Sequence, residues 1–258
     1  MHQILRSPTP GGPRHKGRWS TPLALLLIAA STVGPTAAFG QILGPTPYLQ
    51  FSDSPFAHVS GFSYFYLETF ENHLFDVPGV TATATGRPGI DYGVSSVVFG
   101  PNIHDSVDGD DGVIDGSGLL GDSFFAWAGQ DGITFTFDGA ALGGLPTHAG
   151  IVWTDGTNNI LFKAYDQNGV LLGSQVGDHA DGNFSGGTAE DRFYGAINSG
   201  GISRIFIANG PGGIEVDHLQ YGRLSTDITT TPEPSSIALL GTGMFGLVGL
   251  RGGRRKRS

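Results

Sequence analysis

Ile133-Thr-Phe-Thr-Phe137 alternates apolar and polar side chains without interruption, and the expected fold can be built outward from it. Successive side chains of a β-strand point to opposite faces of a sheet, so the isoleucine and both phenylalanines share one face. Such a strand has one face in an apolar core and the other in solvent. The stretch therefore predicts a β-sheet that packs against a second layer.

Short runs rich in β-branched and aromatic residues recur on both sides, and nearly every gap between them contains glycine with Asp, Asn or Pro. Those are the residues that turns require. No window between residues 59 and 222 has a sustained helical period. About ten strands at this spacing predict an all-β fold, an antiparallel β-sandwich of the jelly-roll type. The other runs are Phe62–Phe70, Val94–Phe99, Phe124–Trp127, Ala149–Trp153, Ile160–Tyr165, Val170–Leu172, Arg192–Ile197, Ile202–Ile207 and Ile214–Tyr221.

Two of these runs carry more local detail. Tyr165-Asp-Gln-Asn-Gly-Val170 predicts a hairpin, because its Asn-Gly pair tolerates the positive φ of a tight reversal. In the last run, strict alternation separates two sets of side chains and makes His218 a core or interface residue. One set is Ile214, Val216, His218 and Gln220, and the other is Glu215, Asp217, Leu219 and Tyr221.

Composition and charge exclude several classes of protein. The chain has 258 residues and no cysteine, so a disulfide framework, a thiolate metal site and a thiol nucleophile are excluded. Between residues 39 and 231, five Lys and Arg stand against 22 Asp and Glu, a formal charge of −17. Such an acidic body repels nucleic acid and attracts cations, so a nucleic-acid-binding function is excluded.

The amino-terminal residues 1–40 have the features of a secretory signal peptide. A basic leader precedes the apolar run 23–30, and small residues follow at 35–40. A basic start, a short apolar stretch and a small-residue cleavage site are typical of such a signal. The alternative is a retained membrane anchor, for which the apolar run is short against the ~20 residues of a spanning helix.

The remainder divides into a β-sandwich domain at 41–222, a Thr/Ser-rich linker at 223–231 and a three-part tail at 232–258. The tail begins with Pro232-Glu233-Pro234 and continues with an uncharged apolar run, 237–250, which predicts a hydrophobic helix. Positive charge beside an apolar helix holds that end on the cytoplasmic side of a membrane. The basic residues that end the tail are Arg251, Arg254, Arg255, Lys256 and Arg257.

This tail resembles the PEP-CTERM sorting signal of bacterial exported proteins. The resemblance implies an exosortase-type membrane protease as partner and cleavage near Glu233. It also implies a place in the cell envelope or extracellular matrix, with exopolysaccharide as a possible neighbour. A helix of fourteen residues spans about 21 Å, less than the ~30 Å hydrocarbon core, so we expect a transient membrane span that is removed.

The most acidic stretch, residues 104–118, suggests a calcium-binding loop. Calcium takes six to eight oxygen ligands from a loop that can wrap around it, and Asp interspersed with Gly suits both needs. The spacing departs from the EF-hand pattern, and a solvated acidic loop is the alternative. The candidate ligands are Asp105, Asp108, Asp110, Asp111 and Asp115.

A second resemblance links the two ends of the sandwich domain. Leu67-Glu-Thr-Phe-Glu71 and Gly213-Ile-Glu-Val-Asp-His-Leu219 are similar to the ends of concanavalin-A-like and carbohydrate-binding jelly rolls. The resemblance implies that Glu71 and Asp217 share a structural calcium ion. The alternative is that both carboxylates face solvent at strand edges.

The sequence contains no complete motif of a known enzyme class. Residues 116–121 match G-x-G-x-x-G, but the sequence that follows predicts a strand rather than a helix. Neither a G-x-S-x-G elbow nor a zinc-type His pair is present.

Among the aromatic residues, Trp127 and Trp153 are the first candidates to stack on sugar rings, and Tyr194 and Tyr221 are the second. The alternative for each is core packing.

The preferred interpretation is therefore an exported, non-enzymatic protein of the cell envelope or matrix. Two alternatives remain. A calcium-dependent carbohydrate-binding module would place an exposed aromatic patch beside an acidic loop. A glycan-active hydrolase would place a carboxylate pair of shifted pKa in a closed cleft.

Overall fold

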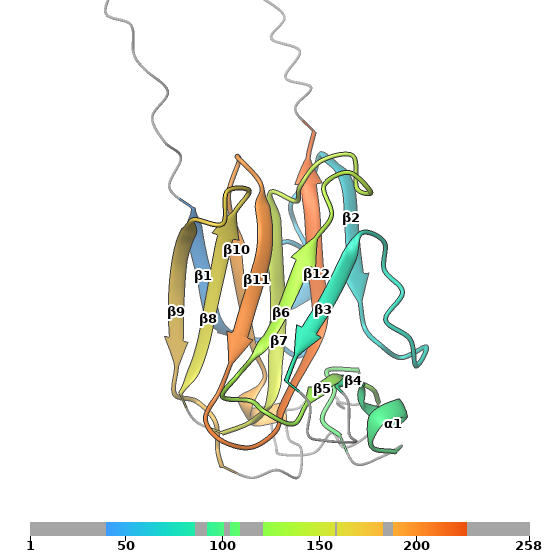
Figure 1. Cartoon of the computed structure of the whole chain (residues 1–258), viewed down its shortest axis with the longest axis vertical. Coiled ribbons are helices and arrows are strands. Elements are labelled where there is room, and N and C mark those ends of the chain that lie inside the picture. The colour runs from blue at the N-terminus through green and yellow to red at the C-terminus, as the bar shows by residue number, and fades with distance from the viewer. Residues whose placement is uncertain are drawn as a thin grey trace, which may run out of the picture. The chain divides into compact units, whose positions relative to one another are not determined.

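A computed structural model describes residues 40–85, 92–100, 104–108, 121–157, 159–182 and 188–225. Two antiparallel sheets pack face to face as a sandwich, which confirms the all-β prediction (Figure 1). The signal peptide, the sorting tail and most of the linker predicted from the sequence lie outside the described residues.

The larger sheet has its strands in the spatial order β1, β10, β7, β12, β5 and β4, and β2 pairs with the second half of β12. Its strands are β1 (Gln41–Pro47), β2 (Phe62–Glu68), β4 (Gly93–Val94), β5 (Phe124–Ala126), β7 (His148–Gly156), β10 (Arg192–Ile197) and β12 (Ile214–Leu224).

The smaller sheet has the order β3, β6, β11, β8 and β9. Its strands are β3 (Val80–Ala84), β6 (Ile133–Phe137), β8 (Ile160–Asp166), β9 (Leu171–Gly177) and β11 (Ile202–Ala208). The short helical elements are η1 (Phe51–Asp53), α1 (Ser95–Val98) and η2 (Thr188–Glu190).

Most strand predictions are confirmed to within a few residues, and the hairpin between β8 and β9 is confirmed, with Gly169 at a φ of 75°. The predicted strand Val94–Phe99 is wrong beyond its first residue. There the buried Asp122 carboxylate accepts hydrogen bonds from the Ser95 hydroxyl and the Ser96 amide, and the chain turns into α1. The strands β1 and β3 were not among the predicted runs.

The core between the sheets contains the side chains of β6 that the alternating sequence predicted to be buried. Ile133 and Phe135 are completely buried, and Phe137 is 4% exposed. Aromatic side chains from the larger sheet, Trp153 and Tyr221 among them, fill the space opposite. The expected face of β6 is therefore confirmed.

A second apolar cluster lies on the outer face of the larger sheet. Tyr48, Phe56 and Val107 pack there against Val152 of β7 and Phe193 of β10. These side chains cover the middle of the sheet, so every residue of β7 is buried. A strand buried on both faces does not show the simple alternation of a half-buried one.

Two β-bulges interrupt the pairing of β7 with β12. One lies at Asp217–Gln220, where His218 has a positive φ of 47°. Val216 and Leu219 therefore both face the core. The strict alternation predicted for this strand is wrong from residue 218 onward, because a bulge adds one residue and reverses the facing of all that follow.

The other bulge lies between the register pairs Val216–Trp153 and Glu215–Asp155, so Thr154 is the additional residue on β7. Directly opposed residues of an antiparallel pair point to the same face. The bulge thus places Asp155 beside Glu215 on the outer face of the sheet, while Trp153 remains in the core.

Both ends of the sandwich domain are near each other in the fold. Gln41 of β1 pairs with Ile197, which pairs with His148, and His148 pairs with Gly222 near the end of β12. The first residues of β12 lie at the opposite end, about 30 Å away for a strand of this length (Figure 1). β12 continues to Leu224, two residues into the predicted linker.

Candidate binding site

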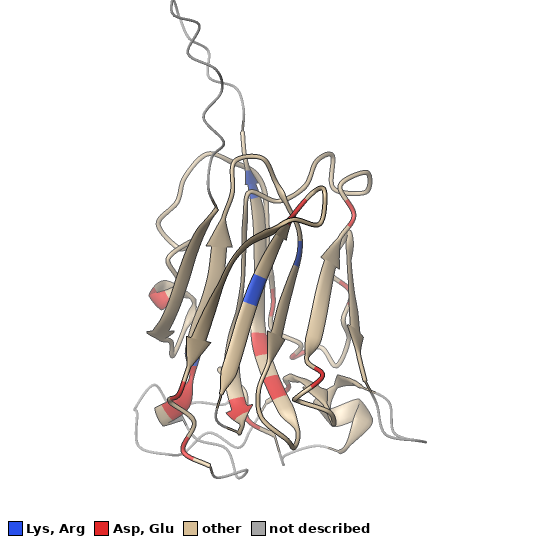
Figure 2. Cartoon of the chain, turned by 60° about the vertical axis from the view of Figure 1, so that its left-hand side comes forward, with Lys and Arg blue, Asp and Glu red and all other residues tan. Residues whose placement is uncertain are grey.

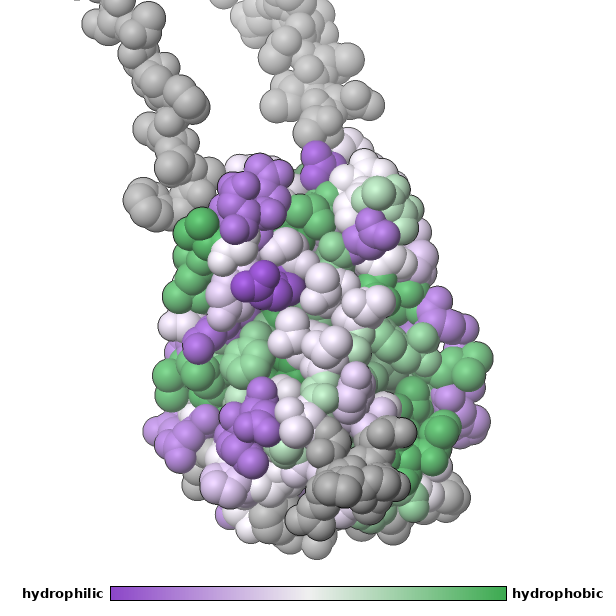
Figure 3. Space-filling view, viewed as in Figure 1, coloured by the Kyte–Doolittle hydropathy of each residue, from purple (hydrophilic) through white to green (hydrophobic). Residues whose placement is uncertain are grey.

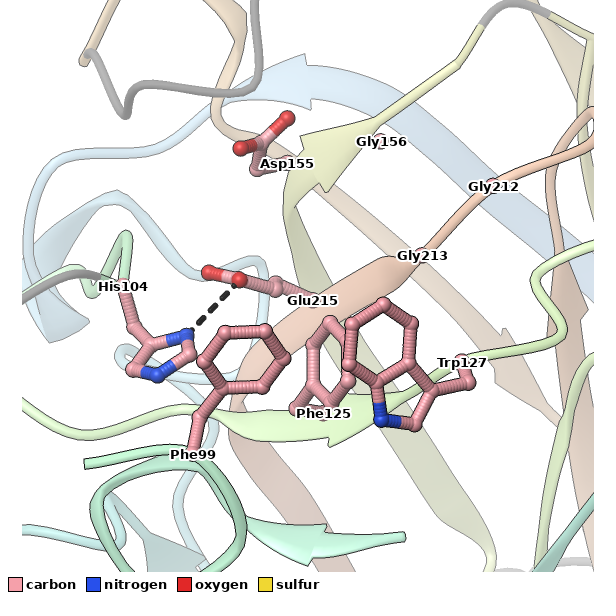
Figure 4. Close-up of a pocket in the computed structure, with 9 residues that line it drawn as sticks. All are labelled: Phe99, His104, Phe125, Trp127, Asp155, Gly156, Gly212, Gly213 and Glu215. Atoms are coloured by element: carbon pink, nitrogen blue, oxygen red, sulfur yellow. Dashed lines mark hydrogen bonds and ion pairs between the residues drawn. The ribbon is translucent and has the colours of Figure 1, made fainter. Parts of the chain in front are cut away.

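A pocket of about 310 Å³ opens at the end of the sandwich where β12 begins, away from both domain termini (Figure 4). Its lining combines three aromatic rings, one histidine, two carboxylates and three glycines. The residues come from α1 and the segments that follow it, from β5, from the end of β7 and from the start of β12. Several acidic positions lie toward this end of the ribbon (Figure 2).

One wall of the pocket is aromatic. The Phe99 ring lies 4.8 Å from the Trp127 ring, measured between centroids, and Phe125 meets Trp127 edge to face at 5.1 Å. Phe99 is 43% exposed, although large apolar side chains are usually covered. Leu74, between β2 and β3, and Val97, in α1, are also exposed. Figure 3 shows apolar surface at the lower right of the molecule.

The polar part of the pocket is built around Glu215. Its carboxylate accepts hydrogen bonds from His104 Nδ1 at 3.0 Å and from the Asp105 amide at 2.7 Å. These two contacts fasten the segment 104–108 to β12. Because Nδ1 donates to the carboxylate, Nε2 of neutral His104 is an acceptor, and this buried atom has no partner among the described residues.

Asp155 is the second carboxylate of the pocket. It is only 4% exposed, and its Oδ1 has no hydrogen-bond partner within the described part of the chain. Burial, together with the nearby charges of Glu215 and Glu190, raises the pKa of Asp155 to about 8. A buried polar atom without a partner is costly, so this oxygen is a candidate contact for a group from outside the domain.

Glycines allow the backbone to form the rim. Gly156 has a φ of +151°, and a Cβ atom at this position would lie 2.2 Å from Nδ2 of Asn209. The same Asn209 amide donates to the Gly213 carbonyl at 3.0 Å. The end of β7 therefore packs closely against the segment before β12 at the rim of the pocket.

A buried polar network holds the segment 104–108 further along β12. Ser106 Oγ lies 3.1 Å from both Glu71 Oε1 and Asp217 Oδ2. The Tyr48 hydroxyl is hydrogen-bonded to His218 Nδ1 at 2.8 Å, and His218 Nε2 lies 3.3 Å from Asp108 Oδ2. His218 is thus an interface residue between the sheet and the segments that cover it.

The predicted calcium ligands are partly brought together. Glu71 and Asp217 approach through the Ser106 hydroxyl, while Asp105 is buried and Asp108 is exposed. In the ranges that the structure describes, no group of three or more acidic or histidine side chains could hold a metal. The remaining candidates, Asp110, Asp111 and Asp115, lie outside those ranges, so calcium binding stays a prediction.

The predicted stacking residues differ in their burial. Trp153, Tyr194 and Tyr221 are completely buried between the sheets, so they offer no open ring face to a sugar. The bulge at Thr154 leaves Trp153 pointing inward. Trp127 is half-buried and lines the pocket, so it remains a candidate.

Sequence analysis did not identify Phe99, His104, Asp155 or Glu215 as site residues. The first was assigned to a strand, and the two acids are separated by about sixty positions that give no local sign of pairing. The sequence Thr154-Asp-Gly156 at the end of a β-run was the available signal, since Asp and Gly at a strand end are compatible with a bulge.

Buried carboxyls in and near the site predict a stability that falls with rising pH. Desolvation raises the pKa of Asp155 to about 8, and of Glu190 and Asp217 to about 7. Each group holds its proton in the folded chain at pH values where the unfolded chain, with a pKa of about 4, has lost it, so stability decreases between these limits. Burial lowers the pKa of His148 and His179, which opposes this trend below pH ~6.5.

We therefore expect the melting temperature to fall between pH 6.5 and 8.5, by about 2–4 °C for each kcal/mol lost. Asp155→Asn should flatten the profile, because the amide does not titrate. Differential scanning fluorimetry across this range measures both. A melting temperature that rises with pH in this interval would contradict the assignment.

A family model matches the carboxyl-terminal part of the chain. The model of the PEP-CTERM protein-sorting motif matches residues 230–256. No curated protein and no solved structure gives a significant match, so the jelly-roll assignment and the calcium site that it implied stay predictions.

The motif supports a general conclusion about where the protein is sent. It implies an exported protein with a carboxyl-terminal membrane-anchoring region, which an exosortase, a membrane protease, sorts and processes. Within the ranges that the structure covers, no helix is long and apolar enough to cross a membrane.

Proposed function

We propose that the sandwich is a non-enzymatic saccharide-binding module of the cell envelope or extracellular matrix, delivered there by its sorting signal. The observation that carries the proposal is the aromatic wall of the pocket, where half-exposed Phe99 leans on Trp127 beside the acidic segment 104–108. This is the arrangement expected of a carbohydrate-binding module. Exopolysaccharide is the natural polymer for such a module at a bacterial surface.

The chemistry of the wall suits a sugar ring. A pyranose has an apolar face of C–H groups and a polar rim of hydroxyls. Trp127 and Phe99 offer a ring surface for the apolar face. Asp155 Oδ1 and His104 Nε2 are acceptors for hydroxyl hydrogens at the rim. A volume of about 310 Å³ accommodates one sugar unit with part of its neighbours.

The position of the pocket supports the same function. The strand that leads to the sorting tail ends at Leu224, at the end of the sandwich opposite the pocket. A domain held near its carboxyl terminus would therefore present the pocket away from its attachment point, toward surrounding polymer.

A glycan-active hydrolase is the second candidate, and the pair Asp155–Glu215 favours it. The two carboxyls are direct cross-strand neighbours, and the pKa of Asp155 is raised to about 8, as a general acid requires. We prefer binding without cleavage, because both oxygens of Glu215 accept hydrogen bonds from His104 and Asp105. A nucleophile or base needs an oxygen free to reach the sugar or a water.

Trp127→Ala and Phe99→Ala should each weaken saccharide binding by roughly tenfold, which corresponds to ~1.4 kcal/mol for a lost stacking contact. The measurement is a glycan array with the full-length protein in calcium and in EDTA, followed by calorimetric titration with the best ligand. Release of reducing ends from that ligand would instead support the hydrolase.

Tyr165→Ala is the matched control. This half-exposed tyrosine lies on the outer face of the smaller sheet, where Arg204 stacks 4.0 Å above its ring. Its loss should leave binding unchanged. Unaltered binding by Trp127→Ala and Phe99→Ala, with melting temperatures near that of the wild type, would refute the assignment of the pocket. Equal binding in EDTA would refute calcium dependence alone.

A further inference from the structure

We infer that the pocket selects sugar units that carry a free amine, such as deacetylated hexosamines, through the paired carboxylates of Asp155 and Glu215. The inference rests on the proposed saccharide-binding function and specifies its ligand. It follows from what the polar lining offers, from the charge of that lining and from the arrangement of ring and carboxylate surfaces.

The first argument is the imbalance between donors and acceptors. Asp155 Oδ1 and His104 Nε2 are buried without partners in the described parts of the chain, and in the neutral imidazole both are acceptors. An ammonium group brings three N–H donors and no acceptor. A hydroxyl brings one hydrogen together with lone pairs that would face the carboxylate oxygens.

The second argument is uncompensated negative charge. Asp155 and Glu215 are opposed residues on neighbouring strands and point to the same face, so the charge on Glu215 would repel an ionised Asp155. Burial and this repulsion raise the pKa of Asp155 to about 8, and no cation of the pocket lining favours its ionised form. No Lys or Arg is among the nine residues that line the pocket. A bound ammonium would neutralise this repulsion, and the formal charge of −17 between residues 39 and 231 would favour the approach of a cation.

The third argument is that both surfaces can be used by one ligand. Figure 4 places the three aromatic rings together on one side of Glu215 and the Asp155 carboxylate on another. A hexosamine ring stacked on Trp127 would extend its amine from the ring edge, where a carboxylate can meet it. N-acetylation would remove the charge and add a carbonyl acceptor, so the acetylated sugar should lose this contact.

The test compares three oligosaccharides of one length with the full-length protein by calorimetry at pH 6.5. They are an oligomer of glucosamine, its N-acetylated form and a neutral glucose oligomer. We expect the free amine to bind at least tenfold more tightly than either of the others. The preference should weaken as salt is added, because it depends on charge.

Asp155→Asn should remove most of this preference, measured as the ratio between the affinities for the free amine and for the neutral oligomer. The matched control is Asp138→Asn, because Asp138 is exposed at the opposite end of the sandwich and Asn can still accept the Ala140 amide hydrogen bond that Asp138 accepts. This control removes a carboxylate of the acidic body outside the pocket and should keep the preference intact.

The outcomes separate the inference from the function on which it rests. Equal binding of all three oligomers, or an unchanged preference in Asp155→Asn, would overturn the amine selectivity and leave saccharide binding standing. An equal loss of preference in Asp138→Asn would also overturn it, because net charge rather than the pocket would then be responsible. Failure of every oligosaccharide to bind would overturn the proposed function itself.

Discussion

Replacement of Glu233 by alanine is expected to leave nearly all of the exported protein at full length, whereas the wild-type chain is expected to lose its carboxyl-terminal tail. Glu233 stands between two prolines in the segment that matches the sorting motif. Proline fixes φ and disfavours helix in the residue before it, so the sequence predicts an extended backbone with a single acidic side chain here. An extended backbone is the form that a protease active site accommodates.

Mass spectrometry of the protein from membrane and surface fractions measures this effect. Deletion of residues 251–258 should have the same outcome, because their five positive charges hold the tail in the membrane. The control is Asp227→Ala, which removes an acid six residues upstream, outside the matched segment. Normal maturation of Glu233→Ala would contradict the role of the motif in this chain.

Replacement of Asp217 by alanine is expected to destabilise the sandwich by about 3 kcal/mol, because it removes the acceptor of three buried hydrogen bonds. The side chain is completely buried and accepts hydrogen bonds from Ser106 Oγ, the Val107 amide and the His218 amide. Alanine would leave these donors buried without an acceptor, at a cost of about 1–3 kcal/mol each before relaxation.

Urea denaturation followed by tryptophan fluorescence measures the loss. Asp217→Asn should cost less, because its amide oxygen can accept part of these hydrogen bonds and the residue carries no charge to desolvate. Asp131→Ala, at an exposed position in the turn before β6, should change the unfolding free energy by less than about 0.5 kcal/mol. A loss below ~1 kcal/mol in Asp217→Ala would mean that the network does not hold the segment 104–108.

The fold class was predictable because its signals are local. Alternation in Ile133–Phe137 and the Asn168-Gly169 turn each depend on a few neighbouring residues, and the structure confirms both. The strand predicted for Val94–Phe99 was wrong because the stretch has the composition of a strand. The carboxylate that turns it into α1 belongs to Asp122, which lies more than twenty positions later in the chain.

The candidate site was not predictable in the same way. Trp127 was named from the sequence, but Phe99, His104, Asp155 and Glu215 come from four other segments and converge only when the larger sheet forms. The two bulges between β7 and β12 decide which side chains share a face. A bulge depends on the pairing of strands distant in sequence, so a residue's facing cannot be read from its own strand alone.

The sequence alone determined the all-β sandwich, its acidic body and its sorting signal, since strand periodicity, net charge and a contiguous motif are properties of the chain itself. The tertiary structure decided that Trp153 is core and Trp127 lines a pocket, and that Asp155 lies beside Glu215. Those outcomes depend on strand register and on what covers each face, and both are fixed by contacts between residues far apart in the sequence.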